Sequence, residues 1–149
     1  MGESRMELVD ASLVQINVEA DDWEDAIFKS ASPLVNKGII TEEYPKRVVE
    51  IAKESGPYIV ITPHIALSHA GVKDGALKDA IGFTVLKKAV KFGNESNDPV
   101  KYIFTLSSTL EGGHLAQMAR LVEILQRGNF ETEIEACTTN EKVSEYFNN

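Results

Sequence analysis

The sequence predicts an α/β fold, in which a single mixed β-sheet is flanked by helices on both faces. Two observations lead to this prediction. Short segments rich in β-branched and aromatic residues alternate along the chain with segments whose apolar residues recur at helical spacing. The chain has 149 residues, with no internal repeat and no linker rich in glycine, serine or proline, so residues 1–149 are expected to form one domain.

The amino-terminal part is expected to contain a strand followed by a helix. Residues 13–19 alternate between apolar and polar side chains, which is typical of a strand with one buried face. Asp21 and Asp22 can cap the helix that follows, and Gly38 ends it. Pro33 lies late in this helix, so we expect it to kink or weaken the helix.

A second helix is predicted to begin at Thr41, a good N-cap residue, and to stop before the Gly-Pro pair at Gly56. Three further strands are expected at residues 58–62, 81–86 and 102–106. The segment at 63–70 is interpreted as a connection between the first two of these strands.

The carboxyl-terminal part is expected to be helical. Residues 93–99 are dense in turn residues and predict a loop before the last strand. The clearest helix follows a Gly-Gly pair and ends at Gly128, and two shorter helices are predicted around Phe130 and after Thr139. The apolar stripe of the clearest helix is expected to lie in the core: Leu115, Met118, Leu121, Val122 and Leu125.

The charge balance excludes several classes of partner. Lysine and arginine number 15, aspartate and glutamate 23, and the formal net charge is −8. Such an acidic chain is unsuited to nucleic acids or anionic membranes, which are bound through lysine and arginine. Lys87, Lys88 and Lys91 are too few for a nucleic-acid patch, so we interpret them as a solvated face.

The single cysteine, Cys137, has no partner for an internal disulfide, which fits a reducing compartment. No apolar run approaches the roughly 20 residues that span a bilayer, and the amino terminus has no apolar signal core. These features predict a cytoplasmic protein.

Three histidines are the main candidates for chemistry: His64, His69 and His114. His114 opens a helix, where free backbone N–H groups favour phosphate. A metal-dependent hydrolase that uses all three histidines stays open as an alternative, although no HExxH motif is present. Ser68 lies beside His69 without the glycine frame of a serine hydrolase, so that class is set aside.

The order and spacing of several motifs along nearly the whole chain resemble enzyme IIA proteins of the bacterial phosphoenolpyruvate-dependent sugar phosphotransferase system. The branch is the mannitol/fructose superfamily, and the ascorbate-type IIA proteins are the most similar. The motifs that carry the resemblance are residues 56–61 with Pro63, residues 65–70, residues 92–100, and His114 with residues 121–125.

This resemblance implies the mannitol/fructose-type IIA fold and a role for two of the three histidines. His69 matches the phosphoryl acceptor, which would carry a tele-phosphohistidine intermediate, and His114 matches the histidine that hydrogen-bonds the phosphate. His64 falls at a position without a catalytic role. The implied partners are the phosphocarrier protein HPr, a cognate IIB protein with an acceptor cysteine and, indirectly, a membrane IIC protein. No metal or organic cofactor is implied, and a homodimer stays open.

The sequence departs from the family pattern at three places. Ser68 stands where a proline usually precedes the active histidine, which predicts a less rigid loop or a serine hydroxyl that bonds the phosphoryl group. Gly71-Val72 replaces an Arg-Pro pair, and Ile51 falls where mannitol-type members have an arginine. Despite these changes, we expect the histidines at positions 69 and 114 to share one shallow, open pocket.

An alternative within the same resemblance is a regulatory domain. Its phosphorylation state would be read by a transcription factor or a transporter instead of being passed to a IIB protein. Onward transfer of the phosphoryl group distinguishes the two roles.

Overall fold

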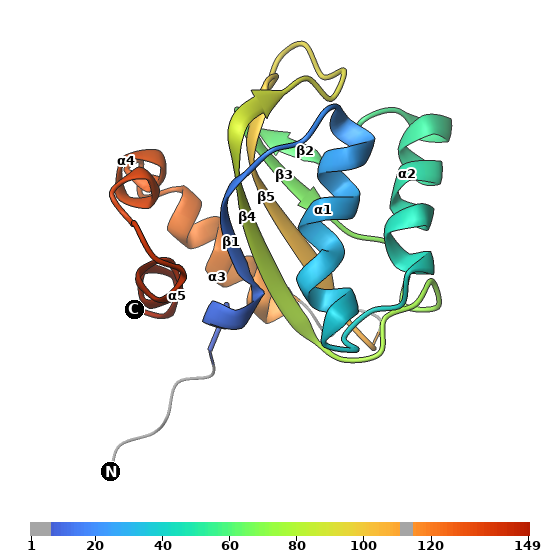
Figure 1. Ribbon diagram of the computed structural model, residues 1–149, viewed down its shortest axis with the longest axis horizontal. Helices are drawn as coiled ribbons and strands as arrows, with labels where there is room; N and C mark the ends of the chain where they lie inside the picture. The colour runs from blue at the N-terminus through green and yellow to red at the C-terminus, as the bar shows by residue number, and fades with distance from the viewer. Residues whose placement is uncertain (1–6, 111–114) are drawn as a thin grey trace.

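The computed structural model describes residues 7–110 and 115–149 and contains a five-stranded mixed sheet in the order β1-β4-β5-β3-β2 (Figure 1). The elements are a 3₁₀ turn at Ala11–Leu13, β1 (Val14–Val18), α1 (Trp23–Asn36), α2 (Glu43–Ser55), β2 (Val60–Thr62), β3 (Ile65–Ser68), β4 (Ala80–Val90), β5 (Val100–Ser107), α3 (Leu115–Leu125), α4 (Phe130–Glu135) and α5 (Asn140–Asn148).

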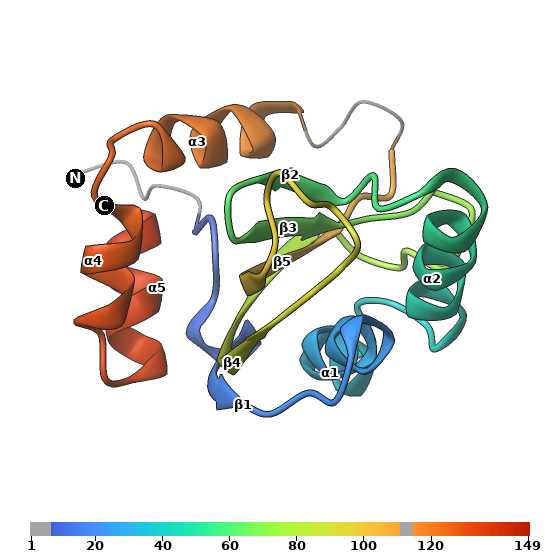
Figure 2. The same ribbon diagram turned by 90° about the horizontal axis from the view of Figure 1, so that it is seen from above.

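Helices cover both faces of this sheet, as the sequence predicts. Helices α1 and α2 lie on one face, and α3, α4 and α5 lie on the other (Figures 1 and 2). Alternate strand residues therefore enter two separate cores. In β5, Tyr102 and Phe104 pack toward α3–α5, whereas Ile103 packs toward α1 and α2.

Aromatic rings fill the core under α4 and α5. Phe83 on β4 is fully buried and lies against Tyr102, Phe104, Phe130 and Phe147, with ring centroids 4.7 to 6.4 Å apart. Buried aromatic pairs at such distances stabilise a fold beyond the area that they bury. Helices α4 and α5 are short, and these aromatic contacts hold them on the sheet.

The strand directions place the ends of β3 and β5 beside the start of β4. Strands β3 and β5 are parallel, with Ser68 paired with Thr105, and the antiparallel β4 begins beside the end of β5, where Ala80 pairs with Ser107. We call this end of the sheet, at which β3 and β5 finish and β4 starts, the His69 end. It is the lower end of the molecule in Figure 1.

Helix α1 continues through Pro33 to Asn36, so this proline does not end the helix, and the predicted kink or weakening stays a prediction. A proline leaves the carbonyl four residues earlier, here that of Lys29, without its helical donor. The side chain of Gln15 on β1 donates to this carbonyl at 2.9 Å, so the sheet supplies the missing hydrogen bond.

Thr41 does not cap α2 as predicted. The N-cap residue is Glu42, which makes no side-chain hydrogen bond to the helix. The backbone N–H of Thr41 instead donates to the Gly75 carbonyl at 2.9 Å. Thr41 therefore serves to tie the start of α2 to the loop that follows His69. The caps predicted at Asp22 and Thr139 are confirmed, since each side chain accepts a backbone N–H of its helix.

Two other expectations also need correction. Residues 65–68 form β3, an inner strand, rather than part of a connection between strands. In α3, Leu121 and Ile124 are buried, but Leu115 and Val122 are 66% and 48% exposed, so the predicted apolar stripe lies only partly in the core.

The lysines near the end of β4, Lys87, Lys88 and Lys91, are exposed, as expected of a solvated face. In the described parts of the chain, no helix combines the length and the apolar character needed to cross a membrane.

Candidate functional site

His69 follows the last residue of β3, at the His69 end of the sheet, and its side chain is half-buried. Its ring nitrogen Nδ1 lies 2.9 Å from the carbonyl oxygen of Leu67. A carbonyl oxygen can only accept, so Nδ1 must carry the proton of this hydrogen bond. In the neutral imidazole the other nitrogen, Nε2, then holds a free lone pair. The backbone of β3 thereby leaves Nε2 as the ring nitrogen that has a lone pair.

Two tyrosine hydroxyls contact the peptide group that follows this ring. Tyr58 donates to the carbonyl oxygen of His69 at 2.6 Å, and its ring stands edge-on to the imidazole, with centroids 5.3 Å apart. The N–H of Ala70 donates to the hydroxyl of Tyr44 at 3.0 Å, and that hydroxyl donates to the Leu106 carbonyl at 2.6 Å.

Both tyrosines stay protonated at neutral pH. Burial raises the pKa of Tyr58 to about 12, with Tyr44 adding to the shift and Arg47 opposing it. Burial also raises the pKa of Tyr44, against the effect of its hydrogen bond from Ala70. Each hydroxyl therefore remains available as a donor over the whole physiological range.

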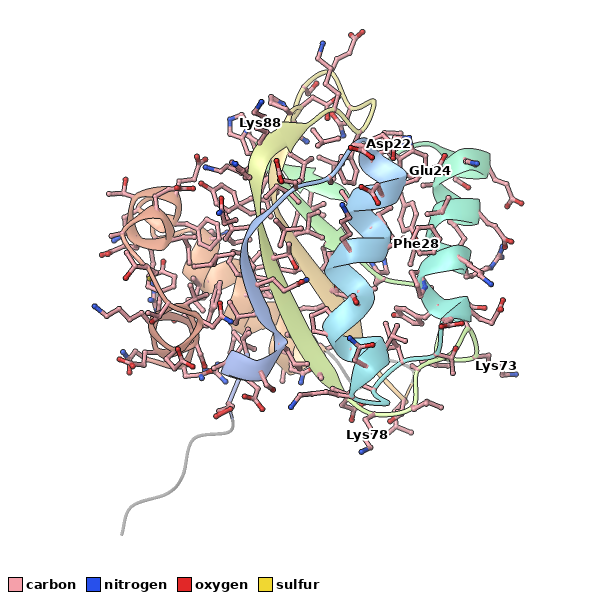
Figure 3. The ribbon with its side chains drawn as sticks, viewed as in Figure 1. Asp22, Glu24, Phe28, Lys73, Lys78 and Lys88 are labelled. Carbon is pink, nitrogen blue, oxygen red and sulfur yellow. The ribbon has the colours of Figure 1, made fainter. Side chains whose placement is uncertain are left out.

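The loop after His69 is held by an acidic side chain. Asp74 accepts the N–H of Gly71 at 2.7 Å, and its other oxygen lies 3.8 Å from Nε of Arg47 on α2. Lys73 and Lys78 project from this same end of the molecule, opposite to Lys88 (Figure 3). Basic side chains therefore occur at this end of the molecule although the chain as a whole is acidic.

Arg47 is the residue that the sequence pattern did not single out. The family comparison by position pointed to Ile51, which is not basic. Arg47 lies four residues earlier on the same helix, so it occupies the same face one turn away. Considering helical neighbours of the expected position, rather than that position alone, would have found it.

Ser68 does not lie in a loop. It is the last residue of β3, paired with Thr105, and only 1% of its surface is exposed. The predicted loosening of the chain before His69 is therefore wrong, because sheet hydrogen bonds fix this residue. The Ser68 hydroxyl is buried beside His69, and its hydrogen bond to a phosphoryl group stays a prediction.

His64 lies at the other end of β3, in the turn after β2. Its backbone is left-handed, with φ 70°, and Nδ1 lies 2.8 Å from the Pro99 carbonyl. The backbone N–H of His64 donates to Asn97 in the loop before β5, and its carbonyl accepts from the N–H groups of Lys101 and Tyr102 at the start of β5. This histidine joins the β2–β3 turn to the loop before β5.

A centre built from all three histidines does not fit this arrangement. Five residues of extended chain separate His64 from His69, which is about 16 Å at the rise of a strand. The two rings cannot ligate one metal ion, whose protein nitrogen ligands lie about 2 Å away. Among the described residues, no group of three or more His, Cys, Asp or Glu side chains could hold a metal.

His114 lies outside the described residues, and its distance from His69 remains a prediction. The cavity of about 570 Å³ beside β2 is not part of this site, because it is lined at the opposite end of β3, by residues that include Thr62, Pro63 and Val122.

Comparison with known proteins identifies the family. The protein-family model described as "Phosphoenolpyruvate-dependent sugar phosphotransferase system, EIIA 2" matches residues 7–149 of the sequence. The chain belongs to this family. The ascorbate-specific PTS system EIIA component of Escherichia coli strain K12 is 27% identical to this IIA domain over 143 residues, covering 93% of this chain and 91% of the relative.

Solved structures of similar proteins share the fold. The mannitol-specific cryptic phosphotransferase enzyme IIA CmtB from Escherichia coli has a TM-score of 0.84 and 26% identity, covering 96% of this chain and 99% of the other. Enzyme IIA for mannitol, solved in complex with its phosphorylated IIB from Escherichia coli, has a TM-score of 0.79 at 22% identity, covering 93% and 96% of the two chains.

Membership of the family defines the general activity. IIA components are phosphotransferase components of the sugar phosphotransferase system, and this IIA domain is a phosphoryl carrier of that system. The predicted family and the predicted fold class are therefore both confirmed.

Proposed function

We propose that this IIA domain is a cytoplasmic carrier that accepts a phosphoryl group on Nε2 of His69 from the phosphohistidine of HPr. It then passes the group to a cysteine of a cognate IIB protein, for uptake of an ascorbate-like sugar through a membrane IIC protein. The observation that carries the proposal is the hydrogen bond of 2.9 Å between Nδ1 of His69 and the Leu67 carbonyl. It leaves the lone pair on Nε2, at the end of the sheet where β3 and β5 finish.

The first step is an in-line displacement at phosphorus. The lone pair of Nε2 of His69 forms a new N–P bond while the N–P bond of the HPr phosphohistidine breaks, and its electron pair returns to the HPr imidazole. In the second step the thiolate of the IIB cysteine forms a P–S bond, and the bond from Nε2 to phosphorus breaks. The proton stays on Nδ1 throughout, donated in a hydrogen bond to the Leu67 carbonyl, so His69 never needs a separate base.

Positive charge and hydrogen-bond donors stabilise the equatorial oxygens in such a reaction. We assign the guanidinium of Arg47 and the imidazole of His114 to this role. Arg47 is close enough to the site to act on the pKa of Tyr58, the tyrosine that contacts the His69 ring. Arg47 pairs with two carboxylates, through Nε with Asp74 at 3.8 Å and through Nη1 with Glu50 at 3.3 Å, so phosphate would be bound by the remaining N–H groups of the guanidinium.

The curated relatives support the proposed sugar class, since several of them are named ascorbate-specific components. A IIB partner is supported by the solved complex of the mannitol-type IIA protein with its phosphorylated IIB. A carrier of this kind takes one phosphoryl group from a donor protein and gives it to an acceptor protein. It therefore requires a site that both partners can reach in turn.

The proposal is tested by reconstituting the relay from phosphoenolpyruvate, enzyme I, HPr and this IIA domain. The wild type should gain one acid-labile phosphoryl group. His69→Ala should abolish labelling, His114→Ala should slow or block onward transfer more than it lowers stability, and His64→Ala should leave labelling unchanged. Label that persists in His69→Ala, or that moves to His64, would contradict the assignment.

Addition of the cognate IIB protein separates the carrier from the regulatory alternative. A carrier loses its label to the IIB cysteine, whereas a regulatory domain keeps the label. A metal assay on the purified protein, run beside this experiment, tests the hydrolase alternative.

A further inference from the structure

The peptide group between His69 and Ala70 is bound at both of its polar atoms by side chains from outside the strand. The carbonyl oxygen accepts from Tyr58 at 2.6 Å, and the N–H donates to the hydroxyl of Tyr44 at 3.0 Å. A peptide group is planar, so fixing its oxygen and its nitrogen fixes the orientation of the whole unit. Sheet pairing ends one residue earlier, at Ser68.

Tyr44 is itself held in place. Only 2% of its surface is exposed, and its hydroxyl donates to the Leu106 carbonyl at 2.6 Å while it accepts from Ala70. Its hydroxyl thus joins the chain after His69 to the end of β5, where backbone pairing between β3 and β5 has stopped. The hydroxyl uses a donor and an acceptor at once, which phenylalanine cannot reproduce.

Tyr58 acts on the imidazole in a second way. Its ring lies edge-on to the His69 ring, at an interplanar angle of 77°, while its hydroxyl holds the main chain of the same residue. The His69 ring is thus fixed by the hydrogen bond from Nδ1 to Leu67 and by the contact with the Tyr58 ring, and its backbone is fixed by the Tyr58 hydroxyl. Burial keeps the Tyr58 hydroxyl protonated, with a pKa of about 12, so the contact persists at physiological pH.

We propose that Tyr44 and Tyr58 are positioning residues for phosphoryl transfer, and that together they hold the backbone of His69 so that Nε2 points to the incoming phosphorus. This inference rests on the proposed function of His69. Neither hydroxyl touches the phosphoryl group. Both act through the His69–Ala70 peptide, and we refer to the pair of hydroxyls as the tyrosine clamp.

The variants Tyr44→Phe and Tyr58→Phe test the tyrosine clamp, with Tyr102→Phe as the matched control. Tyr102 is also buried and also donates a hydrogen bond of 2.6 Å, but to Glu135 on the other face of the sheet. The three variants remove one hydroxyl each and keep the aromatic ring. If a loss of stability alone slowed transfer, Tyr102→Phe should be slowed as well.

The first readout is the single-turnover rate of phosphoryl transfer from phosphorylated HPr. We expect each clamp variant to be slower on the order of tenfold to a hundredfold, because small misplacements of a reacting atom have effects of this size. Tyr102→Phe should transfer within about twofold of the wild-type rate, as its hydroxyl lies outside the site. Clamp variants as fast as Tyr102→Phe would overturn the proposal.

The second readout is the ¹H–¹⁵N spectrum of the His69 imidazole in the unphosphorylated protein. The wild type and Tyr102→Phe should show one tautomer, with the proton on Nδ1. Tyr58→Phe should show a mixture of tautomers, since a ring released from its backbone geometry exchanges protons between its nitrogens. An unchanged single tautomer in both clamp variants would count against the clamp.

The two readouts also separate this inference from the proposed function. If the wild-type domain takes no phosphoryl group from HPr, the proposed function fails, and the imidazole spectrum still decides whether the clamp exists. If Tyr44→Phe does not fold, Tyr58→Phe provides the same test from a less buried position.

Discussion

The left-handed backbone at His64 makes a specific prediction about two substitutions. His64→Ala and His64→Gly both remove the hydrogen bond of 2.8 Å from Nδ1 to the Pro99 carbonyl. At this partly exposed position the loss is worth about 0.5–1 kcal/mol of unfolding free energy. The variants differ in the backbone, because φ is 70° and alanine must keep the strained conformation that glycine adopts freely.

The left-handed conformation costs a non-glycine residue about 1–2 kcal/mol of stability, and His64→Gly removes this strain. Glycine also has more conformational freedom in the unfolded chain, which lowers the stability of the glycine variant by about 0.5–1 kcal/mol. His64→Gly should therefore be about as stable as the wild type, with His64→Ala about 0.5–1 kcal/mol below both. This order is the reverse of the usual preference for alanine over glycine.

Urea denaturation of the three proteins measures these differences, provided that the slope with denaturant is the same for all. Labelling from phosphorylated HPr serves as the control and should be equal in all three. An alanine variant at least as stable as the glycine variant would refute the reasoning from the backbone.

Three further predictions concern the sheet and its cores. Gly82→Ala should lower stability by about 1–3 kcal/mol in urea denaturation, because its Cβ would lie 2.5 Å from Cδ1 of Leu34. Phe83→Ala should cost about 3–5 kcal/mol in the same assay, since it empties the centre of the aromatic core. The hydrogen bond from Lys101, with one from the Tyr102 hydroxyl, lowers the pKa of Glu135 below its ordinary 4.5. The stabilisation of the fold by ionised Glu135 is thus present above pH 4.5 and is lost on acidification. Glu135→Gln should therefore show a shallower fall in the free energy of unfolding at low pH.

Local patterns in the sequence predict most elements of the fold. Alternation identified β1, and the caps at Asp22 and Thr139 placed the starts of α1 and α5. Strand β3 was missed because all four of its residues are buried, so that Ile65–Ser68 shows no alternation. A short, wholly buried strand has no periodicity that distinguishes it from a loop.

The remaining errors arise where tertiary contacts decide the outcome. The Lys29 carbonyl, which Pro33 leaves without a helical donor, accepts a hydrogen bond from Gln15 on another element, and no local signal indicates that contact. In α3, the sequence cannot show how much of a helical stripe faces the sheet, and Leu115 and Val122 lie outside the contact. Amphipathic spacing identifies a helix, whereas burial depends on what covers it.

At the candidate site, the motif resemblance indicates His69, but the sequence cannot show which ring nitrogen keeps its lone pair. That choice depends on the carbonyl of Leu67, two residues earlier, which lies 2.9 Å from Nδ1 in the folded chain. The contacts of Tyr44 and Tyr58 likewise come from α2 and the loop after it, and no spacing along the chain relates them to position 69.

The position of the phosphorus atom tests the central claim most directly. The domain, with ¹⁵N-labelled histidine, is phosphorylated through enzyme I and HPr, and the coupling between phosphorus and the imidazole nitrogens is measured. We predict a single coupled ring, that of His69, with phosphorus on Nε2 and the proton retained on Nδ1. Phosphorus on Nδ1 of His69, or on the ring of His64 or His114, would contradict the account.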